Sequence, residues 1–265
     1  MKRNNRPAKR FHFKRFPRRP RLEMNAFPSM VTAGNAIFGF LSIIYLFKEK
    51  FATAALFIFF ASLFDFFDGR LARLLNVSSD FGSELDSLAD ALSFGAAPAL
   101  LAYKWGLNNC EPFSVIIATL FMLSGLLRLA RFNVLHKVYP QENSYFVGLP
   151  IPMAASAIYS LVLIHPEPLQ KRIEVLIFAL VVVLFAFLMS CTIRFKSFKD
   201  MKVGSRHFGP VIFMGLVILG LIYYPGYTIA LMLYGYVIYN LIRALLSKPA
   251  PSPVEENDSP HTEES

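Results

Sequence analysis

The sequence predicts an all-α integral membrane protein with about eight transmembrane helices. Hydrophobic residues make up 55% of its 265 residues, and the mean hydropathy is +0.46. Two apolar segments, 51–64 and 91–103, reach spanning length only if each helix continues into adjacent charged sequence. Six further stretches carry no charge and approach the roughly 20 apolar residues that a membrane span needs: 30–47, 112–127, 149–164, 175–193 and the two parts of 208–242, which Pro225 and Gly226 separate.

A strongly basic N-terminus sets the expected orientation. The first 21 residues carry ten Lys and Arg and no acid, and positive segments stay on the cytoplasmic side. An even number of spans then puts both termini, and the loops 134–148 and 192–207, in the cytoplasm. We expect a multi-pass protein of the cell's inner membrane. Its basic arm, 1–26, should lie on anionic membrane lipids rather than nucleic acid, because each charge near such a surface contributes about 1 kcal/mol.

Composition divides the chain into three parts. The basic arm precedes one transmembrane domain, 27–246. The tail, 247–265, is rich in Pro, Ser and acidic residues. Such a segment cannot bury enough apolar surface to fold, so we expect it to be disordered. Any chemistry should therefore belong to the transmembrane domain.

The predicted helix over 51–75 ends in DFFDGRLAR, which carries charge into a segment built for lipid. A solvated helix end would need no particular spacing of its polar residues, and no glycine in mid-helix, which costs about 1 kcal/mol relative to alanine. Here the small and polar residues recur at the spacing of one helix face. We therefore expect a single stripe with room for a bulky ligand, formed by Asp65, Asp68, Gly69, Ala72 and Arg73.

A second stripe follows on the next helix. The stretch NVSSDFGSELDSLAD, 76–90, places Gly82, Asp86 and Asp90 four residues apart, again on one face. Both stripes belong to the cytoplasmic ends of adjacent antiparallel helices, so we expect them to face each other. The four carboxylates would repel one another there unless a cation neutralised them.

An all-carboxylate site favours hard cations such as Mg²⁺ or Mn²⁺ over zinc, which prefers nitrogen and sulfur ligands. Mg²⁺ held by carboxylates commonly shares its ligand sphere with the phosphates of a substrate. Arg73, one turn from Asp68 and Gly69, can pair with such a phosphate. The stripes therefore indicate phosphoryl transfer at a membrane surface.

The two stripes together form the pattern D-x₂-D-G-x₂-A-R-x₈-G-x₃-D-x₃-D, from Asp65 to Asp90. This pattern resembles the signature of the CDP-alcohol phosphatidyltransferases at every fixed position and spacing. The resemblance implies a helical bundle of that type, and an enzyme that moves a phosphatidyl group from a CDP-linked lipid to an alcohol with release of CMP. It also implies that Asp65, Asp68, Asp86 and Asp90 bind the metal, and that Asp90 is the catalytic general base.

Other segments resemble the phosphatidylserine synthase branch of that family. Residues 27–40 hold its P-x₃-T-x₂-N pattern, although Ser29 stands where the branch often has Asn, and LLRLARFNV (126–134) and FVGLPIPMAA (146–155) are also similar. The resemblance implies CDP-lipid contacts from Pro28, Asn35, Gly69, Ala72, Arg73, Ser79 and Gly82. Beside the resemblance, we expect acceptor contacts from Arg128, Arg131, Asn133, Gly148 and Pro150.

The acceptor residues have a second explanation that needs no ligand. Arginines accumulate at cytoplasmic helix ends, whereas an acceptor that carries a carboxylate would need an arginine to hold it. Gly148 and Pro150 similarly form either a rigid turn alone or a wall of the acceptor pocket.

We expect transfer from CDP-diacylglycerol to the hydroxyl of L-serine, and the resemblance implies a homodimer. Another acceptor, glycerol phosphate or an inositol phosphate, stays open. A transporter or channel also stays open, because carboxylates in a membrane mark ion pathways. Against that, the four Asp crowd one membrane end and no inverted repeat is visible. A scaffold that recruits partners through the basic arm is the third alternative.

Overall fold

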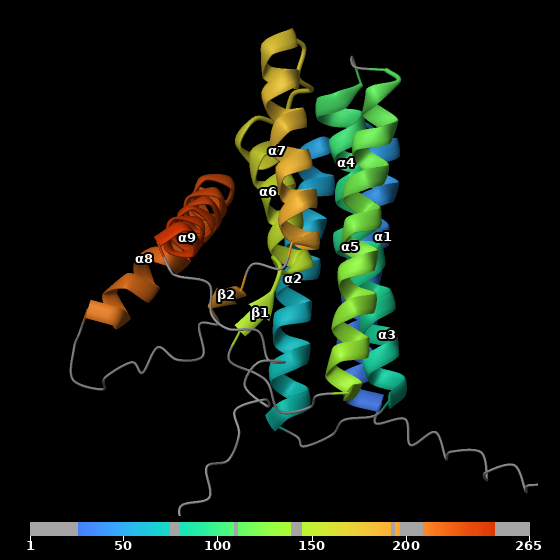
Figure 1. The fold of residues 1–265 in the computed structure, drawn as a ribbon, viewed down its shortest axis with the longest axis vertical. Helices are drawn as coiled ribbons and strands as arrows, with labels where there is room; N and C mark the ends of the chain where they lie inside the picture. The colour runs from blue at the N-terminus through green and yellow to red at the C-terminus, as the bar shows by residue number, and fades with distance from the viewer. Residues whose placement is uncertain are drawn as a thin grey trace, which may run out of the picture.

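The described part of the chain forms eight helical rods and one pair of short strands (Figure 1). This computed structural model describes residues 26–74, 80–108, 111–138, 145–191, 194–196 and 209–246. The third rod is continuous and contains two π-helical segments, η1 and η2. The rods are α1 (Ala26–Phe47), α2 (Phe51–Leu74), then α3 (Asp80–Asp90) with η1 (Ala91–Ala96), α4 (Ala97–Ala102) and η2 (Tyr103–Leu107), α5 (Phe113–Val138), α6 (Ile151–Ile164), α7 (Arg172–Ser190), α8 (Gly209–Tyr223) and α9 (Pro225–Leu246).

The expected all-α architecture is confirmed, and both short apolar segments extend into charged sequence as predicted. Among the described helices, four are long and apolar enough to cross a membrane: Phe51–Arg70, Phe81–Leu107, Phe113–Leu135 and Arg172–Ser190. Three shorter apolar helices accompany them, Val31–Phe47, Ile151–Ile164 and Met214–Tyr223. The chain is therefore a membrane protein.

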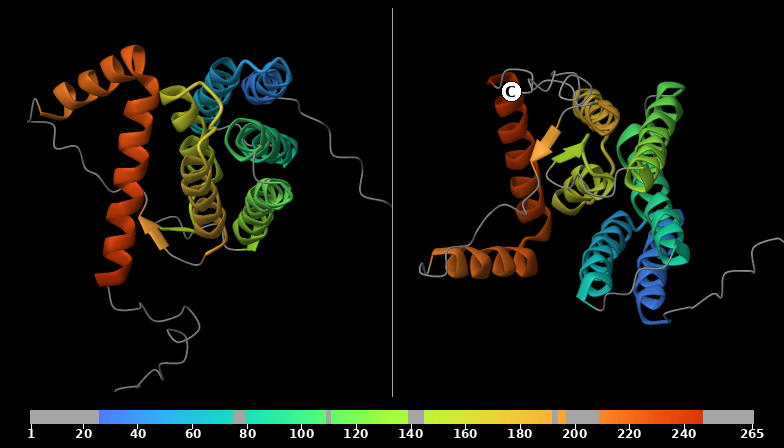
Figure 2. Two further views of the ribbon diagram at one scale, coloured as in Figure 1. Left: turned by 90° about the horizontal axis from the view of Figure 1, so that it is seen from above. Right: turned by 60° about the horizontal axis from the view of Figure 1, so that its bottom comes forward.

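The last two helices, α8 and α9, lie beside the bundle. Pro225 separates them, as the sequence predicts. Figures 1 and 2 show both helices running across the bundle rather than along it. α9 packs on α6 and α7, where the Tyr234 hydroxyl donates to the Ala157 carbonyl at 3.4 Å and the Tyr234 ring meets Phe185 edge-on. The expected number of eight membrane spans therefore stays a prediction.

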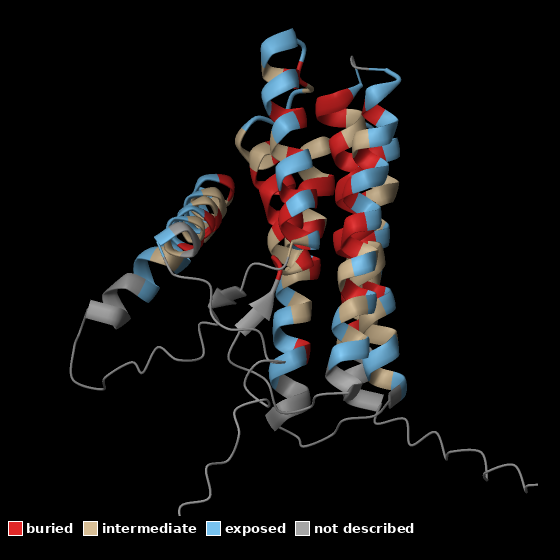
Figure 3. Cartoon of the chain, viewed as in Figure 1, coloured by how far each residue is buried: buried red, intermediate tan, exposed pale blue. Residues whose placement is uncertain are grey.

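The core fills the middle of the bundle (Figure 3), where small residues let helices approach closely. A Cβ added to Gly39 on α1 would overlap Ser93 on η1. The outer face of α7, in contrast, exposes Leu176, Leu180 and Phe187 at 62%, 70% and 65%. Soluble proteins rarely expose apolar patches of this extent, so this surface is suited to lipid.

The strands β1 (Tyr145–Val147) and β2 (Arg194–Lys196) pair antiparallel, with Phe146 opposite Phe195. They belong to the two loops that the sequence places on one side of the membrane, and their pairing agrees with that arrangement. The acidic tail lies outside the described residues, and so does the basic arm apart from Ala26, which begins α1.

Candidate active site

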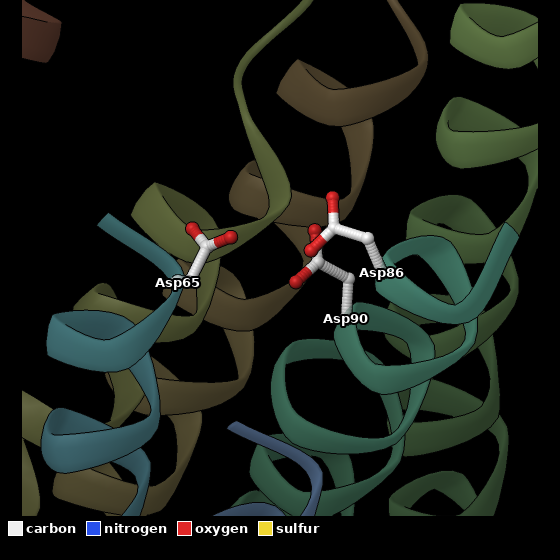
Figure 4. Close-up of side chains that lie close together, drawn as sticks. All are labelled: Asp65, Asp86 and Asp90. Atoms are coloured by element: carbon white, nitrogen blue, oxygen red, sulfur yellow. The ribbon is translucent and has the colours of Figure 1, made fainter. Parts of the chain in front are cut away.

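Three of the four predicted carboxylates meet between α2 and α3. Figure 4 shows Asp65 reaching from α2 towards Asp86 and Asp90 on α3. One carboxylate oxygen from each of these residues lies within 4.8 Å of the other two. The spacing of four between Asp86 and Asp90 directs both to the same side of α3. The helix phasing expected from the sequence therefore brings Asp65 of the first stripe opposite Asp86 and Asp90 of the second.

The fourth carboxylate, Asp68, lies beside this group, near enough for its charge to interact with Asp65 and Asp86. Its side chain is 7% exposed and accepts a hydrogen bond from the Thr32 hydroxyl of α1. Asp68 follows Asp65 by three residues, which turns it about 60° around the helix axis, and this rotation directs it towards α1. The structure thus places Asp68 at the edge of the cluster of Asp65, Asp86 and Asp90.

Asp90 is held at the last position of α3. The Asn35 side-chain amide of α1 donates to Asp90 Oδ1 at 3.0 Å, and Asn35 itself is fully buried. The next residue, Ala91, begins the π-helical segment η1, and such segments are frequent at functional sites. Asn35 is expected from the sequence to contact the CDP-lipid, but here its amide contacts a carboxylate of the cluster.

The donor set of the cluster fits a hard divalent cation. Its three ligand groups are carboxylates that converge from two helices, and oxygen ligands are those that Mg²⁺ and Mn²⁺ prefer. Three like charges this close also repel one another strongly in a half-buried position. A bound cation would relieve that repulsion, so Asp65, Asp86 and Asp90 are the residues that would hold it.

The remaining residues expected at the CDP-lipid belong to α1, α2 and α3 or lie outside the described residues. Gly69 is exposed on α2, and Gly82 is half-buried on α3. Pro28 belongs to α1, and Ala72 and Arg73 belong to the last turn of α2, with side chains that are not described. Ser79 lies outside the described residues. The two glycines therefore stand one turn from Asp65 and Asp86, respectively.

Arg128 on α5 is the expected acceptor residue that approaches the cluster. Its charge lies near enough to interact with both Asp65 and Asp90. Its side chain is half-buried, and its buried Nε has no hydrogen-bond partner among the residues that the structure describes. A buried cation is stable only when neighbouring charges and hydrogen bonds compensate it. The two carboxylates supply part of that compensation.

The next two expected acceptor residues connect helices. Arg131 Nη2 donates to the carbonyl of Cys191 at 3.4 Å, which joins α5 to the end of α7. The Asn133 amide donates to Ser87 Oγ at 2.9 Å, and Ser87 Oγ lies 3.3 Å from Asn133 Oδ1. Asn133 therefore joins α5 to α3 within the turn that separates Asp86 from Asp90.

Gly148 and Pro150 form a tight turn into α6. Gly148 has a φ of +77°, and a Cβ there would lie 2.6 Å from the Met189 carbonyl oxygen. The Leu149 amide donates to the Leu188 carbonyl at 2.9 Å, and Pro150 precedes the first residue of α6. The rigid turn is observed, and an acceptor contact of Gly148 and Pro150 stays a prediction. The turn packs against the C-terminal end of α7.

Thr32 and Ser87, for which the sequence predicts no functional role, both form hydrogen bonds within the site. Thr32 and Asn35 are three residues apart in a largely apolar helix, so their shared face is visible in the sequence. The partner of each depends on which helix packs on that face, and spacing alone does not give it. Ser87 offers no comparable signal, because serine is common in helices near a membrane surface.

Comparison with known proteins gives consistent matches. The sequence model of the CDP-alcohol phosphatidyltransferase family matches residues 25–191, which include every residue of the cluster. A Helicobacter pylori (strain 26695) protein named CDP-diacylglycerol–serine O-phosphatidyltransferase is 36% identical over 222 residues, which cover 83% of this chain and 91% of that protein. A Bacillus subtilis protein of the same name is 44% identical over 131 residues (49% and 72%). A Methanothermobacter thermautotrophicus archaetidylserine synthase is 38% identical over 137 residues (51% and 57%).

Proposed function

The chain belongs to the CDP-alcohol phosphatidyltransferase family, and we propose that it transfers the phosphatidyl group of CDP-diacylglycerol to L-serine, giving phosphatidylserine and CMP. The observation that carries this proposal is the meeting of Asp65, Asp86 and Asp90 in the register of the family's signature. Two relatives that match most of the chain's length are named CDP-diacylglycerol–serine O-phosphatidyltransferase, and these names support serine as the acceptor.

Divalent metal dependence is a property of the family, and Mg²⁺ and Mn²⁺ are the proposed ions. Asp65, Asp86 and Asp90 would hold the cation, with Asp68 as a further carboxylate beside them. When bound, the cation supplies positive charge that neutralises the diphosphate of the donor. Gly69, Gly82 and Arg73 are proposed to receive the rest of the CDP group.

Asp90 is proposed as the general base. Its Oδ1 accepts the hydrogen bond from Asn35, which leaves Oδ2 to take the proton of the serine hydroxyl. As that proton leaves, the serine oxygen forms a bond to the β-phosphorus of the donor. The bond from this phosphorus to the CMP oxygen breaks, and CMP departs with the electron pair. The cluster offers no thiol or imidazole as a covalent nucleophile among the described residues, so direct displacement is the proposed route.

Arg128 is proposed to hold the carboxylate of the serine. Its half-buried guanidinium beside Asp65 and Asp90 is suited to an anionic partner, and arginine binds carboxylates with paired hydrogen bonds. The same two acidic residues can face the ammonium group of a zwitterionic acceptor. Glycerol phosphate carries no such cation, which favours serine at this position.

The proposed setting is the inner membrane, with the site and both termini in the cytoplasm. Ten basic residues in the first 21 support this orientation and a contact of the arm with anionic lipids. The lipid tails of the donor would stay in the membrane beside the apolar outer faces of the bundle. A homodimer is proposed on the family resemblance.

An acceptor screen tests the proposal. Purified protein in mixed micelles that contain CDP-diacylglycerol and Mn²⁺ should release CMP on addition of L-serine. Glycerol 3-phosphate and inositol phosphate, added separately, should leave CMP release at its background. Dependence of CMP release on either of these phosphorylated alcohols would reject serine as acceptor. If the protein released no CMP with any of the three acceptors, a transporter or a scaffold would explain the protein better than an enzyme.

A further inference from the structure

α1 supplies two polar side chains to the site from positions one turn apart. Thr32 donates to Asp68 on α2, and Asn35 Nδ2 donates to Asp90 Oδ1 on α3 at 3.0 Å. Both donors are buried, Thr32 at 3% exposure and Asn35 at 0%. A single helix therefore holds one carboxylate from each of the two stripes.

In the side-chain amide of Asn35, only the nitrogen has a hydrogen-bond partner among the described residues. Its nitrogen reaches Asp90, and its backbone carbonyl accepts from Ser93 Oγ at 3.0 Å. Its side-chain oxygen is buried and has no hydrogen-bond partner in the described part of the chain. Rotating the amide by 180° would direct that oxygen at the Asp90 carboxylate, where one acceptor would face another. The observed orientation is therefore the one that Asp90 requires.

This arrangement is a poor one for stability alone. A buried polar atom without a partner costs about 1–3 kcal/mol, and an apolar side chain of similar shape would avoid that penalty. The cost is explained if the amide serves the carboxylate. Groups that hold a ligand or base by hydrogen bonds restrict its orientation and commonly change metal affinity or activity by about 10–100-fold when removed.

We infer that Asn35 is a positioning residue, which fixes the Asp90 carboxylate by holding Oδ1 and so directs Oδ2 towards the reacting hydroxyl and the cation. Because its side chain is fully buried, Asn35 acts through Asp90 and does not touch the donor. This inference rests on the proposed function, since it assigns Asn35 a task in the reaction that Asp90 is proposed to catalyse.

The variant Asn35→Leu tests the inference, because leucine has a similar shape and donates no hydrogen bond. We expect kcat to fall about tenfold or more, the usual effect of removing such a partner, with little change in KM for CDP-diacylglycerol. Thermal unfolding measured against Mn²⁺ concentration gives a readout independent of turnover. The Mn²⁺ concentration for half-maximal stabilisation, measured relative to each protein's own Tm without metal, should rise.

Two further variants separate positioning from a structural role. Ser42→Ala changes another buried polar residue of α1, two turns further along the helix, and should leave kcat and Mn²⁺ binding unchanged. In an Asp90→Asn background, Asn35→Leu should have no additional effect on Mn²⁺ binding, because contacting residues that act as a unit are not additive. Asn35→Ala, which only removes atoms, provides the same comparison if leucine prevents folding.

The outcomes distinguish the inference from the function on which it rests. A folded Asn35→Leu protein with wild-type kcat and Mn²⁺ affinity would overturn the inference alone. Additive effects of Asn35→Leu and Asp90→Asn on Mn²⁺ binding would likewise assign Asn35 to the fold. A wild-type protein that stabilises with Mn²⁺ but releases no CMP from CDP-diacylglycerol would reject the proposed function instead.

Discussion

Arg128 and Arg70 are both arginines near the site, but their surroundings differ. Its guanidinium interacts with Asp65 and Asp90 and leaves Nε without a partner among the described residues. Arg70, nearer the end of α2, is exposed and lies over the Phe66 ring at 4.2 Å. Positive charge near the membrane surface explains Arg70. The half-buried Arg128 instead lies beside Asp65 and Asp90, and under the proposed function the carboxylate of the acceptor is a further anionic partner.

The variant Arg128→Gln should therefore act on the acceptor. Loss of a hydrogen bond to a charged group is worth about 1.5–3 kcal/mol, so KM for serine should rise about 10–100-fold while KM for CDP-diacylglycerol changes little. Steady-state kinetics with each substrate varied in turn measures both values. Arg70→Gln is the matched control and should leave them unchanged. A rise in KM for CDP-diacylglycerol alone would assign Arg128 to the donor.

At the scale of elements, the turn into α6 depends on one backbone conformation. Gly148 has a positive φ, and the carbonyls of Met189 and Cys191 occupy the space of a Cβ. The turn supports the end of α7, whose Cys191 carbonyl also accepts from Arg131. A change at Gly148 would therefore affect the contact between α6, α7 and α5 beside the cluster.

We predict that Gly148→Ala lowers stability by about 1–3 kcal/mol, the usual cost of a strained backbone conformation. Thermal unfolding in detergent should show a reduced Tm. Gly215→Ala on α8 is the control, because a Cβ there meets no described atom within 4 Å. It should be neutral or slightly stabilising, since alanine favours helices. Equal Tm values for the two variants would contradict the structural role given to the turn.

Helix phase, read from the spacing of residues, predicted that Asp65 would meet Asp86 and Asp90. The break before α9 was predicted separately, from Pro225. The contact of Asp68 with Thr32 could not be predicted, because phase does not reveal which neighbouring helix a side face meets. The direction of α8 and α9 was equally hidden, since an uncharged run specifies burial or lipid contact but no orientation.

At the scale of the whole molecule, the apolar middle of the bundle and the polar site lie in different places. This separation lets one chain contact both lipid and a charged substrate. The middle of the bundle is closed by residues such as Phe94, Leu101 and Ile158, which are fully buried. Asp65 belongs to the C-terminal half of α2, and Asp86 and Asp90 belong to α3. Figure 1 shows that α2 finishes and α3 begins at the same end of the bundle. An apolar body with a polar site at one end is suited to a donor whose tails stay in lipid while its diphosphate is processed.

The central claim is that the meeting of Asp65, Asp86 and Asp90 is a metal-dependent phosphatidyl-transfer site. The most direct measurement is CMP release from CDP-diacylglycerol and L-serine by purified wild-type and Asp90→Asn proteins, with Mn²⁺ and with chelator. We predict release by the wild type with Mn²⁺ only, and a loss of about 10²–10⁴-fold in Asp90→Asn, as expected for a general base. The exposed Glu84→Gln variant on the same helix should retain wild-type release. Undiminished release by folded Asp90→Asn protein, or by the wild type in chelator, would contradict the claim.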